Sequence, residues 1–435
     1  MRLKPFFREI PGSLALVTVI AILTSVYFYA RMQDFYEPDS PGYIVRAKNM
    51  LAGKGFADSA GRPDTLRTPG YPLLILPFLA ANLDLKYLIL LQHLLRIALI
   101  IAASIGAYAL SGQRRQALFT GLVLSMDLPF LKSANNILTE TMFAAVLAVV
   151  LLLLWKDSKK NGAAGMQLAL AALLSGALVL IRPVALLFFL PAVAYIFLVR
   201  SEKKLRTALL FIFCFALAPM VWSARNDRAT GYFAVSSISG FTMMQERAAG
   251  VLSIDEPGDF YANLEKHQRE LESATCRHWE SMGRDCSQVS DAEKSRYYSQ
   301  VGSRIVLHHP LAYLKLAMRG VAITMLAGSP ASLSALTGIS FNSAAKLLLV
   351  YTMPMFLLSF VGLWGFWRAN RAFFWLAALT CVYFVGISAG AESFARFRVP
   401  IMPIYGILVA NGIALAFDRF SSFSTDERAG ESAAR

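Results

Sequence analysis

The sequence predicts an all-α, polytopic membrane protein with about 10–11 transmembrane helices, juxtamembrane helices on the outer face and a small extramembrane helical lobe. Of the 435 residues, 56% are apolar and only 16% are charged, against about 25% charged in soluble domains. The mean hydropathy is +0.51. Apolar runs of about 20 residues, long enough to cross a hydrocarbon core of about 30 Å, recur along the chain. These observations exclude a Rossmann-type enzyme, a disordered scaffold and a secreted disulfide-rich module.

The first apolar run, residues 10–30, follows Arg2, Lys4 and Arg8. Tyr27, Phe28 and Tyr29 stand where a signal peptide would have small residues, so we expect an uncleaved first span with a cytoplasmic N-terminus. Nine further spans are expected at residues 86–110, 116–131, 138–155, 166–181, 184–199, 207–224, 346–367, 372–389 and 399–417.

The net charge of +14 is explained by basic residues in short loops, which is typical of positive-inside topology and not of nucleic-acid binding. The clusters follow alternate spans, and placing all of them inside gives one consistent orientation with a cytoplasmic C-terminus. They are Arg114 and Arg115; Lys156, Lys159 and Lys160; Lys203, Lys204 and Arg206; and Arg368 and Arg371.

The apolar segment 311–328 carries Lys315 and Arg319 four residues apart, on one helical face. Charges at mid-bilayer are unfavourable unless they face a polar cavity. We therefore expect an interfacial or re-entrant helix on the outer side.

The chain divides into a membrane core at 1–224 that includes a first outer loop at 31–85, an outer lobe at 225–310, an interfacial helix with the last spans at 311–417, and a disordered tail at 418–435. The lobe holds Cys276 and Cys286, which an oxidising compartment would allow to form a disulfide. Cys214 and Cys381 lie within spans and are expected to be ordinary apolar residues.

Candidate functional residues gather in the outer segments. The first outer loop contains Asp39 and Tyr43, followed by Arg67 and Tyr71. A structural role is open for Asp39, since Ser40 before Pro41 is a good helix cap and an acid there favours the same helix start.

Further along, Glu140 begins a span, Arg182 precedes Pro183 in an outer turn, and Arg396 and Arg398 begin the last span. Capping explains Glu140 equally well, and an arginine at the boundary can extend to the headgroups. Two arginines at an outer boundary oppose the positive-inside bias, however, which favours a functional role. If the segment is regular helix, only one of the two can face a cavity, and we favour Arg398.

The sequence contains no phosphate-binding loop and no dinucleotide fingerprint, so no soluble cofactor is expected. Adjacent His308 and His309 cannot easily share one ion, and no metal site is expected. An enzyme acting on the outer face needs a donor that is already activated in the membrane, and a polyprenyl-phosphate sugar meets that need. A phosphate leaving group requires one base and a cationic clamp, without a general acid.

These residues, in this order, resemble a bacterial glycosyltransferase of the GT-C superfamily, similar to the protein-mannosyltransferase and aminoarabinose-transferase group (glycosyltransferase family 39). The features that carry the resemblance are Asp39-Ser40, Tyr43, Ala47, Leu51, Gly53, Gly55-Phe56, Arg67, Pro69-Gly70-Tyr71-Pro72, Thr139-Glu140-Thr141, Arg182-Pro183, Trp222, Arg225-Asn226, His309-Pro310 and Arg396-Phe397-Arg398-Val399-Pro400.

The resemblance implies inverting transfer of one sugar from a polyprenyl-phosphate donor to a lipid, polysaccharide or protein acceptor on the periplasmic face of a bacterial inner membrane. By this resemblance Asp39 matches the first-loop acid that contacts or deprotonates the acceptor, and Glu140 matches a second polar position near the cavity. Better-known members carry a large C-terminal extramembrane domain, and here the loop at 225–310 is expected to form the acceptor side without one. Three alternatives stay open: an O-antigen-ligase-like polymerase, a transporter of envelope lipid or glycan, and a non-catalytic assembly subunit.

Overall fold

A computed structural model describes residues 11–158 and 165–433, and in these ranges the chain is helical, with no strand and one isolated β-bridge between Ala57 and Pro63. The predicted all-α class is confirmed. The basic residues Arg2, Lys4, Arg8, Lys159 and Lys160 lie outside the described residues.

The helices of the first half, in chain order, are α2 (Pro11–Arg31), α3 (Ser40–Leu51), α4 (Gly70–Ala80), α5 (Lys86–Ser111), α6 (Arg114–Met126), α7 (Leu128–Asn135), α8 (Glu140–Ser158), α9 (Met166–Ile181), η1 (Pro183–Ala185), α10 (Phe189–Val199) and α11 (Lys204–Thr230). The second half contains α12 (Ile238–Phe241), the π-helix η2 (Thr242–Ala248), α13 (Ala249–Ser253), α14 (Phe260–Ser281), η3 (Cys286–Gln288), α15 (Asp291–His308), α16 (Pro310–Leu326), α17 (Pro330–Thr337), α18 (Phe341–Ala369), α19 (Arg371–Ile387), the 3-10 helix η4 (Ala395–Ile401) and α20 (Met402–Ala433).

Seven helices of the described chain are long and apolar enough to cross a membrane, or eight if the pair α6 and α7 counts as one bent span. Ten spans were predicted. The predicted spans that fall short are α9, α10 and α19, which are shorter apolar helices, whereas the segment Pro310–Thr337 meets the criterion although it was expected to be interfacial. The molecule is a multi-pass membrane protein.

The last span, α20, forms the centre of the helix bundle. In the candidate span Ala395–Arg419, which consists of η4 and the first part of α20, 78% of the apolar window is buried, against 22% in α2 and in α18. It packs closely on α18, where a Cβ on Gly362 would lie 1.8 Å from the Leu408 carbonyl oxygen and one on Gly412 would lie 2.0 Å from that of Leu358. Small residues on both helices permit this backbone approach.

Large apolar side chains on the outer helices are exposed, as expected for surfaces that face lipid. Val221, Val350 and Val382 are each 72% exposed and lie on α11, α18 and α19.

The predicted span at 116–131 is broken. Its two parts, α6 and α7, are bent by 58° around Asp127, whose side chain accepts a hydrogen bond from the Phe130 N–H and caps α7. Pro129 in the first turn cannot continue a helical ladder from α6. Asp127 followed by Leu-Pro is the local signal for this break.

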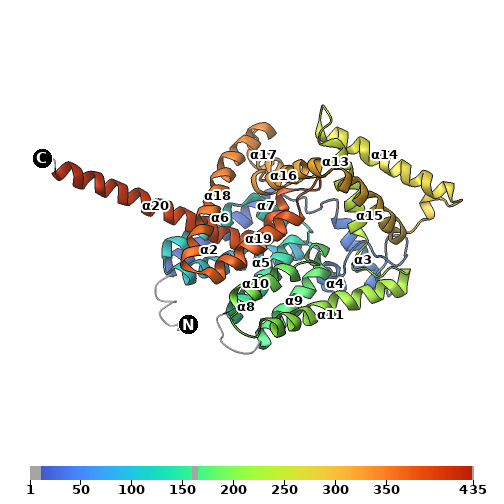
Figure 1. The fold of residues 1–435 in the computed structure, drawn as a ribbon, viewed down its shortest axis with the longest axis horizontal. Helices are drawn as coiled ribbons and strands as arrows, with labels where there is room; N and C mark the ends of the chain where they lie inside the picture. The colour runs from blue at the N-terminus through green and yellow to red at the C-terminus, as the bar shows by residue number, and fades with distance from the viewer. Residues whose placement is uncertain (1–10, 159–164, 434–435) are drawn as a thin grey trace.

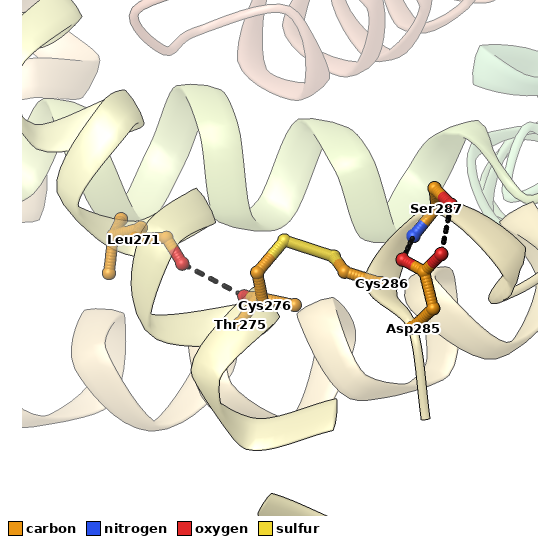
Figure 2. The surroundings of a disulfide bond; sticks show 6 residues. All are labelled: Leu271, Thr275, Cys276, Asp285, Cys286 and Ser287. Atoms are coloured by element: carbon orange, nitrogen blue, oxygen red, sulfur yellow. Dashed lines mark hydrogen bonds between the residues drawn. A yellow bond between two sulfur atoms is a disulfide. The ribbon is translucent and has the colours of Figure 1, made fainter. Parts of the chain in front are cut away.

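The segment 225–310 supplies the end of α11 and the helices α12 to α15. In Figure 1 α14 and α15 lie at one end of the molecule, and the C-terminal part of α20 projects from the other end. A disulfide joins Cys276 and Cys286 (Figure 2), as their spacing allowed. The Asp285 side chain accepts the Ser287 N–H at 2.8 Å and starts the short turn η3 that carries Cys286.

The helix α16 contacts this lobe through both of its basic residues. Lys315 Nζ lies 2.6 Å from a carboxylate oxygen of Asp255, and the Arg319 guanidinium lies 3.8 Å from the centre of the Phe260 ring. The charges of Lys315 and Arg319, which argued against a membrane-spanning helix, thus contact the lobe.

The C-terminal tail differs from the prediction. The backbone of α20 continues as helix to Ala433, whereas disorder was expected from residue 418. Residues 418–433 contain no proline and a single glycine, so nothing in this stretch ends a helix that has already begun.

Candidate functional site

Five of the eight predicted site residues come together as a charged cluster at one cavity. The cluster consists of two carboxylates and three guanidiniums from five separate parts of the chain: Asp39, Arg67, Glu140, Arg182 and Arg396. They line a cavity of about 490 Å³, within the roughly 300–1,000 Å³ range of small-molecule sites.

Asp39 is held between two arginines. One of its oxygens lies 2.7 Å from Arg67 Nη2 and the other 3.1 Å from Arg396 Nη2. The residue directly precedes α3, but its carboxylate caps no N–H of that helix. Burial opposes ionisation of Asp39, yet the charges of Arg67 and Arg396 outweigh it and hold the pKa of this carboxyl below its ordinary value. The helix-capping explanation for Asp39 is therefore not supported.

Glu140 occupies the deeper part of the cluster. Its side chain is 2% exposed, and its Oε1 lies 2.6 Å from Arg182 Nη1 and 3.6 Å from Arg396 Nε. Arg182 also donates to Thr139 Oγ1 at 3.0 Å. Arg396 thus links both carboxylates.

The cluster has one excess positive charge, since three guanidiniums face two carboxylates. Arg396 Nη1 is buried and, within the part of the chain that the structure describes, has no hydrogen-bond partner. A buried donor without a partner is unfavourable unless a ligand supplies the acceptor. Both features favour binding of an anion.

The Arg67 backbone is fixed by a buried ion pair that the sequence reasoning missed. Arg46 donates through Nε and Nη2 to the two oxygens of Asp64, at 2.7 and 3.0 Å. Asp64 in turn accepts the Arg67 N–H at 3.1 Å, and Arg225 donates to the Asp64 carbonyl at 2.8 Å. This sequence of bonds sets the start of α4 against α9, where a Cβ on Gly70 would lie 2.6 Å from the Leu180 carbonyl oxygen.

Tyr43 also lines the cavity, and the Arg67 guanidinium lies 5.3 Å from its ring centre. The expectation that Tyr71 binds substrate is not met by its position. Tyr71 is fully buried, packs edge-on against Tyr43, and donates to Gln92 Oε1 at 2.7 Å. Tyr71 therefore supports the Tyr43 ring by packing against it.

Arg398 is the second correction. It does not line the cavity: its Nη2 lies 2.6 Å from Asp127 Oδ2 in a pair whose side chains are 3% and 5% exposed, and its Nη1 donates to the Met325 carbonyl at 2.9 Å. The preference for Arg398 over Arg396 was wrong, because the helix break that places Asp127 there was not expected.

Two further cavity residues were missed, Arg247 of η2 and Glu392 before η4. Their side chains pair at 3.3 Å. Burial raises the pKa of Glu392, opposed by Arg247, and burial together with Glu392 raises the pKa of neighbouring Glu246 to about 7. Arg247 lies in a densely charged loop without any local signature, so no pattern distinguished it.

Comparison with known proteins gives likeness in structure alone. No family model and no curated protein matches the sequence. The chain superposes on the oligosaccharyltransferase AglB from Archaeoglobus fulgidus with a TM-score of 0.53 and 13% identity, covering 97% of this chain and 52% of that one. The chain therefore spans about half the length of the oligosaccharyltransferase.

ArnT from Cupriavidus metallidurans, bound to undecaprenyl phosphate, matches with a TM-score of 0.43 and 15% identity, covering 92% of this chain and 77% of ArnT. The fold and the cavity define a multi-pass membrane protein with the architecture of the oligosaccharyltransferase. The likeness to the oligosaccharyltransferase is one of fold.

Proposed function

We propose that this protein is a membrane glycosyltransferase that moves one sugar from a polyprenyl-phosphate donor to an acceptor on the outer face of its membrane. The observation that carries the proposal is the cluster of three arginines and two carboxylates at one cavity. The oligosaccharyltransferase with the same fold was solved with a dolichol-phosphate, a polyprenyl monophosphate.

In the proposed step, an acceptor hydroxyl attacks the sugar C1 from the face opposite the phosphate. The new O–C1 bond forms as the bond from C1 to the phosphate oxygen breaks, the proton passes to Asp39, and polyprenyl phosphate leaves. The excess guanidinium of the cluster stabilises the negative charge that develops on the phosphate, and Arg396 Nη1 is a free donor for it.

The same contacts suggest how donor binding prepares the base. Without donor, Arg67 and Arg396 lower the pKa of Asp39, which makes it a weak base. A bound phosphate competes for both guanidiniums and weakens their hold on the carboxylate. Donor binding therefore increases the basicity of Asp39 at the moment when a base is needed.

Binding of undecaprenyl phosphate to the purified protein in nanodiscs tests the site. We expect the monophosphate to bind and neutral polyprenol not to bind, with Arg396→Ala weakening the affinity about tenfold or more. The matched control is Arg269→Ala, because Arg269 pairs with Glu265 on the surface of α14. Equal affinity of wild type and Arg396→Ala would contradict the clamp.

Turnover separates the enzyme from its alternatives. A glycosyltransferase releases polyprenyl phosphate and glycosylates an acceptor with inverted anomeric configuration. Movement of intact donor across the bilayer without release indicates a transporter, and consumption of a diphosphate-linked glycan indicates a ligase-like polymerase.

The outer location of the site is tested by cysteine labelling in intact cells. A cysteine in place of Glu280 should be labelled from outside, and a cysteine in place of Lys203 should be protected. Labelling of position 203 from outside would reverse the proposed orientation.

A further inference from the structure

A second charged pair lines the same cavity as the cluster. Nε and Nη2 of Arg247 each lie 3.3 Å from Glu392 Oε1, and Nη2 also donates to the Ile387 carbonyl at 2.7 Å. The side chains are 19% and 17% exposed. The mechanism proposed above uses neither residue.

This pair is looser than the two closest pairs of the cluster and leaves an atom unsatisfied. Its shortest contact is 3.3 Å, against 2.7 Å for Arg67 with Asp39 and 2.6 Å for Arg182 with Glu140. Glu392 Oε2 is buried and has no hydrogen-bond partner among residues 11–158 and 165–433. A carboxylate oxygen only accepts when ionised, so what is missing here is a ligand that donates.

The backbone leaves room for this carboxylate. A Cβ added to Gly390 would lie 2.0 Å from Glu392 Oε2. Arg247 is presented by the π-helical turn η2, and single π-helical turns are frequent at functional sites.

The cavity wall next to the pair is rich in hydroxyls. The neighbouring wall contributes Ser239, Thr242 and Ser388 as well as the apolar Ile238 and Met243. A neutral wall of hydroxyls and one ion pair suits a polyol ring, and it does not attract a second phosphate. A carboxylate and a guanidinium can satisfy the donors and acceptors of adjacent ring substituents at the same time.

We infer that Arg247 and Glu392 bind the hydroxyl or amino substituents of the transferred sugar, while Arg67, Arg182 and Arg396 hold its phosphate. This inference rests on the proposed function. A sugar joined through C1 to a phosphate at the cluster has to lie in the same cavity, and this pair supplies the polar groups that its ring requires.

The test compares two ligands on the same protein in nanodiscs: bare undecaprenyl phosphate, and undecaprenyl phosphate carrying a neutral hexose or a 4-amino pentose. Glu392→Gln, which keeps the shape, and Arg247→Ala should bind the bare lipid as wild type does. For the sugar that the wild type transfers, both should lose affinity about tenfold or more. Glu265→Gln on exposed α14 is the matched control and should change neither affinity.

Retained binding of bare lipid also shows that each variant is folded. Unchanged affinity of both variants for the sugar-bearing lipid would overturn the inference, and so would an equal loss for both ligands. Unchanged donor affinity with a raised acceptor KM would assign the pair to the acceptor and overturn it as well. If the wild type binds neither lipid, the proposed function itself fails.

Discussion

Arg396 and Arg398 are two residues apart in η4 and serve two different regions of the molecule. Arg396 lines the cavity and contacts both Asp39 and Glu140. Arg398 is closed into the interior with Asp127, and both side chains are at most 5% exposed. A network that lines a cavity is suited to binding, whereas a closed pair is suited to holding helices in place.

Arg96 shows that the closed type recurs. It is fully buried and donates to the Leu124 and Ser125 carbonyls at 3.2 and 2.6 Å, just before the break at Asp127. Arg398 likewise donates to the Met325 carbonyl at the end of α16. The last carbonyls of a helix lack partners inside the helix, and cations stabilise that end. These arginines therefore permit broken helices inside the bundle.

The largest effect is expected in the closed region. Asp127→Ala removes the partner of Arg398 and the cap of α7 together. Breaking a buried pair from one side typically destabilises by about 3–5 kcal/mol, because a charge stays buried without compensation. Thermal unfolding in detergent measures this loss.

A double variant checks the physical reason. Asp127→Ala with Arg398→Met removes both charges and should recover a substantial part of the lost stability. Asp39→Ala is the comparison from the open region, where a partly exposed pair should contribute much less. Equal destabilisation by Asp127→Ala and Asp39→Ala would remove the distinction between the two regions.

In the open region the effect falls on activity. Asp39→Asn keeps the shape and removes the charge, so we expect transfer to decrease roughly 10²-fold or more while expression and lipid binding persist. Glu37→Gln is the matched control, since Glu37 pairs with Lys132 at 2.7 Å and does not line the cavity. Full activity of Asp39→Asn together with inactive Glu37→Gln would place the base two residues upstream.

How far the sequence predicted this arrangement depends on the range of each signal. Asp39, Arg67, Glu140 and Arg182 stand at ends of helices on one predicted side of the membrane, and those ends were readable from proline, caps and apolar runs. Since all lie at one face, their convergence could be expected before any contact was known.

The failures come from contacts far apart in the chain. Arg398 pairs with Asp127, which lies 271 residues earlier, and no residue near Arg398 in the sequence indicates this pair. Only one of the two arginines lines the cavity, but their segment is a 3-10 helix and not the regular helix on which that expectation depended, and the choice of arginine was wrong. Asp127-Leu-Pro was a local signal for a helix break that the long apolar run concealed. Arg247 had no signal at all, because π-helical geometry is not readable from its neighbours.

Glu246 sharpens the comparison as a buried acid near the open region. Its pKa is raised to about 7 by burial and by Glu392, above the ordinary value near 4.5. The folded state thus disfavours its ionised form, so this residue reduces stability as pH rises from about 4.5 through 7. Glu246→Gln should therefore stabilise the protein by about 2 kcal/mol more at pH 8 than at pH 5. If Glu246→Gln raises the unfolding temperature equally at both pH values, the folded state does not raise the pKa of Glu246.

The smallest expected effect comes from replacing either arginine of η4 by lysine, and this change distinguishes their two roles most directly. Lysine keeps the charge but lacks the planar fork of donors. At Arg396 this should lower transfer about tenfold and leave the unfolding temperature unchanged, because the cluster keeps its charge but loses the link between Asp39 and Glu140. At Arg398 one ammonium cannot serve both Asp127 and the Met325 carbonyl as the fork does, so Arg398→Lys should lower the unfolding temperature and affect transfer only in proportion to the folded fraction. Loss of transfer in Arg398→Lys at an unchanged unfolding temperature would move Arg398 from the closed region to the open one.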